Sequence, residues 1–150
     1  MKHPILWIHG EALGPANPAL LAHPGRPAVF VFDAELLAGG TATSPEPVSL
    51  KRIAFLYECL LELPVSLRHG DVAAEVLGFA RDHGADGIVT SAGTDPRVAA
   101  ICAQLSKELP LEVLDPEPFV ELDGRVDLGR FSRYWRRAER EVWARWSQEQ

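Results

Sequence analysis

Short apolar runs alternate with helix-like stretches along this chain, and that alternation restricts the fold more than any other feature. Apolar runs stop at polar or glycine residues, as in 5–8 and 28–32. We interpret 5–8, 28–32, 65–68, 87–90 and 111–114 as strands, with helices between most of them. Strands separated by helices indicate right-handed crossovers and a parallel sheet. The pattern therefore predicts a Rossmann-like α/β three-layer sandwich, with strand order 3-2-1-4-5 and helices on both faces.

Capping residues mark where the predicted helices begin. Asn17-Pro18, Asp71 and Asp95-Pro96 each combine an N-cap side chain with a following helical pattern. Apolar spacing predicts helices over 51–63, 71–84 and 95–109, and a final helix over 129–146. Residues 38–47 have a loop composition, and Asp123-Gly124 indicates a short hairpin. We divide the chain into an α/β domain, 1–128, and a C-terminal aromatic and basic helix, 129–150.

Composition excludes several classes of protein. The 150 residues suit one globular domain, and the net charge of -6 argues against a general nucleic-acid-binding surface. The longest apolar runs are too short to cross a bilayer, so we expect no membrane partner. The N-terminus has no secretory pattern, and the two cysteines lie in helical patterns without metal-ligand spacing. We expect a cytoplasmic protein with reduced thiols and no metal site.

The candidate binding edge consists of the segments that follow the strands, at 9–17, 33–37, 69–71 and 91–97, because ligands of such sheets bind there. No glycine-rich dinucleotide loop, P-loop, HExxH or GxSxG motif is present, so no complete catalytic site is recognisable. His9 and Glu11 could take part in acid-base chemistry, or they could be ordinary residues of a solvated loop. Asp33 fits ribose binding or a strand-ending turn. The 91–95 loop is an ordinary turn or a weak phosphate loop at a helix N-terminus.

The final helix carries an unusual number of aromatic residues. Phe131, Trp135, Ala138 and Val142 follow one stripe, which Tyr134, Trp143 and Trp146 widen, and arginines occupy the opposite face. The stripe packs on the domain's own sheet or docks onto another domain or chain. In the second case the partner-binding residues are Phe131, Tyr134, Trp135, Trp143 and Trp146, and the partner is a second copy or a helical flavin-domain protein. We expect no DNA contact by this chain alone.

Several segments in a fixed order resemble the DNA photolyase and cryptochrome family. Residues 6–20, with Trp7 and Asn17-Pro18-Ala19-Leu20, are similar to the family's opening strand and Asn-Pro-Ala-Leu stretch. Residues 29–37 resemble its second strand and Asp-Pro-x-Leu continuation. Residues 49–63 and 70–77 are similar to its next two helical segments, and 131–136 to its closing Phe-Thr-Pro-Phe-Trp stretch. The resemblance covers almost the whole chain and implies the family's N-terminal antenna-side domain.

The resemblance implies a binding module and not a complete light-driven enzyme. His9-Gly10-Glu11 replaces the family's Arg-Arg-Asp, and Ser91–Pro96 keeps only the proline of its antenna loop. The 150 residues do not include the helical domain that would hold FAD, so we expect no FAD in that mode and no repair activity. An antenna-type chromophore (flavin, deazaflavin or folate) or a nucleotide is the expected ligand. The candidate ligand-binding residues are Trp7, His9, Gly10, Glu11, Phe32, Asp33, Leu36, Ser91, Ala92, Gly93, Asp95 and Arg97.

Two further readings compete with a ligand-binding module. An interaction protein without a small ligand would use the aromatic helix to pair two copies or to dock a separate flavin protein. An adenylate-chemistry enzyme would need a glycine-rich loop after the first strand or a His-x-Gly-His motif, and the sequence has neither.

Overall fold

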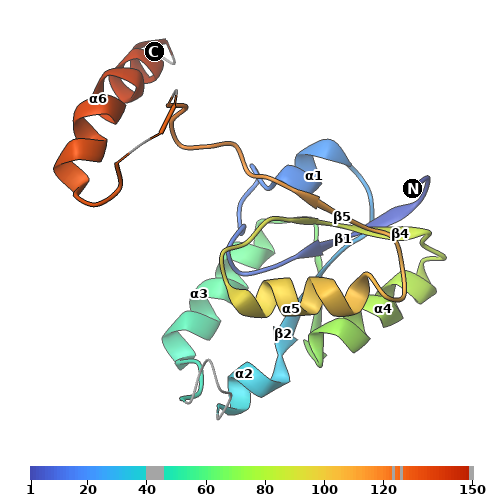
Figure 1. Ribbon diagram of the computed structural model, residues 1–150. Helices are drawn as coiled ribbons and strands as arrows, with labels where there is room; N and C mark the ends of the chain where they lie inside the picture. Colours follow the sequence, from blue (N-terminus) through green and yellow to red (C-terminus); the bar gives the residue numbers. More distant parts are fainter. Residues whose placement is uncertain (40–45, 123, 126, 149–150) are drawn as a thin grey trace. The chain divides into compact units, whose positions relative to one another are not determined.

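Five parallel strands form the central sheet of residues 1–116 in a computed structural model that describes residues 1–39, 46–122, 124–125 and 127–148. The strands are β1 (Pro4–Ile8), β2 (Ala28–Asp33), β3 (Ser66–Gly70), β4 (Gly87–Ser91) and β5 (Leu111–Leu114). They lie in the order β3-β2-β1-β4-β5 (Figure 1). The predicted α/β fold and strand order are confirmed.

The central strand β1 is buried on both faces, which explains its uninterrupted apolar sequence. Leu6 pairs with Ala28 of β2 and with Val89 of β4, so the strands are in register along their length. Trp7 belongs to the core cluster on one face, and Leu6 and Ile8 belong to the cluster on the other. Alternate side chains of one short run thus supply two separate cores.

Helices cover both faces of the sheet. One core contains residues of α4 (Val72–Asp82) and α5 (Pro96–Leu105), and the opposite core contains Ala19 of α1 (Pro18–Ala22). The helix α3 (Leu50–Leu61) buries only one residue, Leu60, among its twelve. It is exposed along much of its length, at Leu50, Phe55, Tyr57 and Leu61. The predicted three-layer arrangement is therefore present.

The predicted N-caps are confirmed, and one helix was missed. The side chains of Asn17, Asp71 and Asp95 accept hydrogen bonds from the first-turn backbones of α1, α4 and α5. Asp33 does the same for α2 (Ala34–Ala38), which the sequence analysis left unassigned. A five-residue helix directly after a strand is too short to show a helical period, so only its cap could have indicated it.

Some element ends differ from the prediction. The strand β3 continues to Gly70 because His69 and Gly70 still pair with Phe32 and Asp33 of β2. The helix α5 ends at Leu105, and the turn after it has the bond from the Lys107 N–H to the Gln104 carbonyl, which is tighter than an α-helical bond. Positions 40–45 of the expected loop, and Asp123 of the expected hairpin, lie outside the described residues.

The chain divides into two compact units, residues 1–116 and residues 117–150. The first is the α/β unit. The second contains α6 (Phe131–Gln148) and the residues before it. Residues 117–128, which the sequence analysis grouped with the α/β domain, belong to the second unit because they contact α6: Asp127 pairs with Arg133 at 2.6 Å, and Arg137 donates to the Arg125 carbonyl at 3.0 Å.

Candidate functional site

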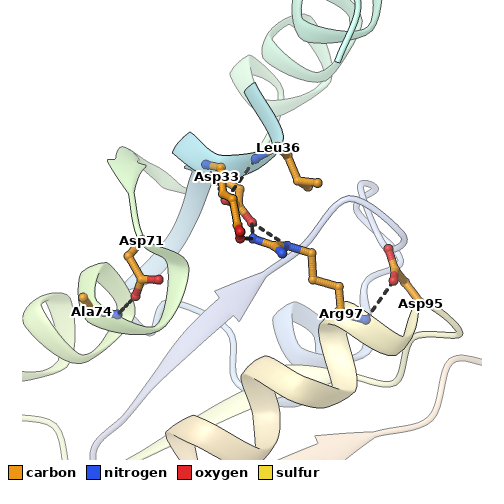
Figure 2. Close-up of polar contacts among 7 residues, drawn as sticks. Asp33, Leu36, Asp71, Ala74, Asp95 and Arg97 are labelled. Atoms are coloured by element: carbon orange, nitrogen blue, oxygen red, sulfur yellow. Dashed lines mark hydrogen bonds and ion pairs between the residues drawn. The ribbon is translucent and has the colours of Figure 1, made fainter. Parts of the chain in front are cut away.

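Three aspartates follow strands at the carboxyl edge of the sheet, and each one caps the next helix. Asp33 accepts from the Glu35 N–H at 3.0 Å, Asp71 from Ala74 at 2.8 Å and Asp95 from Arg97 at 2.8 Å. Figure 2 draws the three aspartates with their hydrogen bonds to backbone N–H groups. These carboxylates are the N-caps of helices α2, α4 and α5, so they have a structural role whether or not a ligand binds at this edge.

Arg97 links two of these helix starts. Its Nε and Nη2 donate to Asp33 Oδ2 at 2.7 and 2.5 Å, and Nη2 also pairs with Glu35 at 2.6 Å (Figure 2). Partial burial acts to lower the pKa of Arg97, but hydrogen bonds to Glu35 and Asp33 outweigh that and raise it. Both Asp33 oxygens are thus engaged, one by the helix α2 backbone and the other by the guanidinium.

Glu11 occupies the N-terminus of α5 from the loop after β1. Its carboxylate accepts from the Thr94 N–H at 2.7 Å, from the Thr94 hydroxyl at 2.9 Å and from the Asp95 N–H at 2.9 Å. The backbone bonds from Thr94 and then Asp95 are the main causes that lower the pKa of Glu11. The helix N-terminus that the sequence analysis considered for phosphate therefore holds a carboxylate of the same chain.

His9 lies buried behind this loop. Its Nε2 lies 2.9 Å from the Ser91 carbonyl, which only accepts, so the proton is assigned to Nε2. Its Nδ1 accepts from the Glu11 N–H at 3.4 Å. The side chain of Asn17 donates to the Ser91 hydroxyl at 3.2 Å and to the Ala12 carbonyl at 2.8 Å. This buried network fixes the loops after β1 and β4 against each other.

A cavity of about 160 Å³ opens beside these groups, at the carboxyl ends of β1 and β2. Its aromatic walls come from the strands, at Trp7, Phe30 and Phe32. Helices α2, α3 and α5 supply aliphatic walls. Among the charged lining residues, Arg52 has a guanidinium with no partner in the part of the chain that the structure describes. The cavity thus combines ring-sized apolar surface with one exposed cation at its wall.

The structure brings most of the predicted ligand residues together at this cavity. Nine of them line it: Trp7, His9, Gly10, Glu11, Phe32, Asp33, Leu36, Asp95 and Arg97. The other three, Ser91, Ala92 and Gly93, do not. Ser91 is fully buried, and Gly93 lies against Glu11, where a Cβ would come within 3.1 Å of the carboxylate. The small residue at 93 gives Glu11 room to reach the helix.

Sequence reasoning missed the walls that helices contribute. The additional lining residues are Ile8, Phe30, Val31, Leu37, Val48, Arg52, Ile53, Leu56, Val72, Val98 and Ile101. The sequence signal for Ile53 and Leu56 was their helical stripe, which indicates burial but not a neighbouring cavity. The position of Arg52 beside them on α3 was the one available signal for a cation at this site.

The helix α6 presents the predicted partner-binding residues with unequal exposure. Phe131, Trp143 and Trp146 are 71%, 55% and 59% exposed, whereas Tyr134 and Trp135 are half-buried. The Phe131 and Trp135 rings stack, with centroids 5.8 Å apart and planes 14° from parallel. Three large aromatic side chains of one helix are therefore more than half exposed.

No group of three or more His, Cys, Asp or Glu side chains is placed to hold a metal ion among the described residues. None of the helices in the described ranges has the length and apolarity needed to cross a membrane.

No family model and no curated protein matches this chain.

Proposed function

We propose that the α/β unit is a photolyase-like binding module for a flat aromatic ligand, held at the carboxyl ends of β1 and β2. The observation that carries the proposal is the cavity between Trp7, Phe30 and Phe32, with Arg52 at its wall. Aromatic side chains stack favourably on planar rings, and a guanidinium binds an anionic substituent. The resemblance of segments 6–20 and 29–37 to the photolyase and cryptochrome family adds support.

The size of the cavity limits the class of ligand. A volume of about 160 Å³ is close to that of a cavity known to hold one benzene ring, so it accepts one end of a flavin, deazaflavin or pterin. The rest of such a ligand would extend past the exposed wall near Arg52. We therefore propose partial insertion of a ring system of the antenna-chromophore class.

The polar groups at the site favour a ring over a nucleotide. A nucleotide bound as in other folds of this class would place its phosphates at the N-terminus of α5, which Glu11 already occupies through three hydrogen bonds. A ribose would need Asp33, whose two oxygens already bind the α2 backbone and Arg97. Binding of ATP would have to break these contacts, so the nucleotide alternative has less support.

Calorimetry with riboflavin, FMN, a deazaflavin, a folate and ATP tests the proposal. We expect at least one of the ring compounds to bind with a Kd well below 1 mM, and ATP not to bind. The variant Leu36→Trp fills the cavity and should abolish binding. Leu21→Trp, at a position that is 66% exposed on α1, is the matched control and should bind as the wild type does.

Two results would contradict a ligand module. One is that no compound binds below about 1 mM, a weak limit in free energy. The other is that Leu36→Trp binds as tightly as the wild type while its circular dichroism is unchanged. The variant Arg52→Gln tests the role of charge, because it should weaken the binding of FMN more than the binding of uncharged riboflavin.

A second candidate function is protein interaction through α6. It is favoured by the exposure of Phe131, Trp143 and Trp146, which belong to the second unit of the chain. The partner would be a second copy of this chain or a helical flavin protein.

A further inference from the structure

The helix α2 is a weakly buried wall of the cavity in the α/β unit. All five of its residues stay partly exposed to solvent, including Leu36 and Leu37, which line the cavity. The walls from α3 and α5 each belong to a longer helix that buries a leucine, Leu60 in α3 and Leu105 in α5. A five-residue helix is not stable on its own, and few buried apolar contacts give a segment low local stability. The position of α2 therefore depends on the polar contacts at its ends.

Arg97 makes the polar contact that joins α2 to α5. Its guanidinium extends from the start of α5 and meets Asp33 Oδ2 at 2.7 and 2.5 Å and Glu35 at 2.6 Å (Figure 2). At the other end of α2, the Leu36 carbonyl accepts a hydrogen bond from the Val48 N–H at 3.2 Å. Arg97 and Leu36 both line the cavity, so the guanidinium bridges two of its walls.

The two carboxylates that Arg97 binds differ in their exposure and in the element that they anchor. Asp33 is 9% exposed and is the last residue of β2, where it pairs with Gly70 of β3. Glu35 lies in the first turn of α2, and its side chain is 62% exposed. The Asp33 pair therefore joins α5 to the sheet, whereas the Glu35 pair joins α5 to α2. An exposed pair is weak and is screened by salt, so the Glu35 pair can open while the Asp33 pair stays closed.

We propose that α2 is a movable wall of the cavity and that Arg97 is the positioning residue that holds it closed through Glu35. This rests on the function proposed above, in which the cavity binds a planar ring. With the pair open, α2 moves away from the cavity and admits the ring. With the pair closed, Leu36 and Leu37 contact the ring, and this contact adds apolar burial to α2. Ligand binding and closure of the pair therefore favour each other.

Amide exchange of the full chain with water, measured by NMR without ligand, tests the movable wall. The Gly39 N–H donates to the Glu35 carbonyl at 3.1 Å, so its exchange rate reports the opening of α2. Glu35→Gln should speed this exchange about two- to fivefold, which corresponds to the usual strength of an exposed pair. The matched control is Asp82→Asn, which removes a 2.6 Å pair with Arg68 at a side chain that is 60% exposed. This control should leave the exchange of Gly39 unchanged.

A double-variant comparison separates the ion pair from the general effect of a carboxylate in the first turn of a helix. In a chain that already carries Arg97→Gln, the further change Glu35→Gln should leave the exchange of Gly39 nearly unchanged, because the pair is already absent. If Glu35→Gln speeds the exchange equally with and without Arg97, or does not speed it at all, the proposal is overturned.

Calorimetry with riboflavin, which carries no charge, tests the coupling between the wall and ligand binding. The Kd of the wild type should rise about two- to fivefold between about 20 and 500 mM NaCl, because salt screens the pair of Arg97 and Glu35. In Glu35→Gln the Kd should already be raised at low salt and should respond less to added salt. Asp82→Asn should behave as the wild type does. An equal response to salt in the wild type and Glu35→Gln would overturn the coupling.

The two experiments distinguish failure of the movable wall from failure of the proposed function. Unchanged exchange of Gly39 in Glu35→Gln, together with binding of riboflavin, overturns the movable wall and leaves the proposed function standing. Faster exchange in Glu35→Gln, together with no binding of riboflavin or of any other ring compound, supports the movable wall and overturns the proposed function.

Discussion

The carboxylate of Glu11 lies 2.7 Å from the backbone nitrogen of Thr94, which is 83 residues later in the sequence and directly precedes Asp95, the N-cap of α5. It satisfies the same backbone donors that a bound phosphate would use. The loop after β1 and the loop after β4 are therefore held together by a charge-assisted contact within the chain.

Removing the charge of Glu11 should change how stability depends on pH. The pKa of Glu11 is lowered in the folded state from 4.5, mainly by the Thr94 and Asp95 N–H groups. A lowered folded pKa means that the charge stabilises the fold above about pH 4.5 and that this contribution is lost as the pH falls through the folded value. Glu11→Gln should cost about 1 kcal/mol at pH 7, since the site is exposed.

Urea unfolding of the wild type and Glu11→Gln from pH 7 to pH 3 measures this. The difference in unfolding free energy should stay constant down to about pH 5 and shrink below pH 4.5. A difference that grows as the pH falls would contradict the contact with the α5 backbone.

A methyl group at position 93 should push Glu11 away from α5. A Cβ on Gly93 would lie 3.1 Å from the Glu11 carboxylate and 3.2 Å from the His9 ring, so one of them must move. Gly93→Ala should destabilise the fold by about 1–2 kcal/mol. Gly14→Ala, where a Cβ meets nothing within 4 Å, is the control and should be nearly neutral. Equal thermal midpoints for the two variants would show that the loop adapts.

Loss of Arg97 should be more costly than loss of an exposed arginine. Asp33 is 9% exposed, and Arg97 is its only side-chain cation among the described residues. Arg97→Gln leaves that carboxylate without its charged partner, so we expect a loss of about 2 kcal/mol in urea unfolding. Arg133→Gln, which removes a solvent-exposed pair with Asp127, should have no measurable effect. If the two variants were equally stable, the Arg97 contact would be as weak as a surface pair.

The two N-caps Asn17 and Ser49 should differ because of burial. The side chain of Asn17 accepts from Ala19 and Leu20 and donates to Ala12 and Ser91, and it is almost fully buried. Asn17→Ala should therefore cost about 2–3 kcal/mol, since buried partners lose their hydrogen bonds. Ser49→Ala removes one exposed cap of α3 and should cost under about 1 kcal/mol. Chemical denaturation of both variants gives the comparison, and a smaller loss for Asn17→Ala would be inconsistent with the network.

The sequence predicted where the aspartates at the edge of the sheet lie, but it did not predict their roles. Asp33, Asp71 and Asp95 each follow a strand, so a position at the carboxyl edge was predictable. The sequence left Asp33 open between ribose binding and a turn, because an aspartate after a strand suits both. The partner that engages it, Arg97, is 64 residues away. Contacts between residues so far apart depend on how the strands are ordered.

The sequence by itself determined the class of fold and most helix starts, because apolar runs and capping residues act over a few neighbours. The strand order was predicted as the usual order of such a fold. It also placed the aromatic stripe on one face of the final helix. Only the tertiary structure decided that Glu11 occupies the α5 N-terminus, that Arg97 engages Asp33, and that α3 contributes a wall and Arg52 to the cavity. These depend on distances between elements that are far apart in the chain, and a local pattern carries no information about such distances.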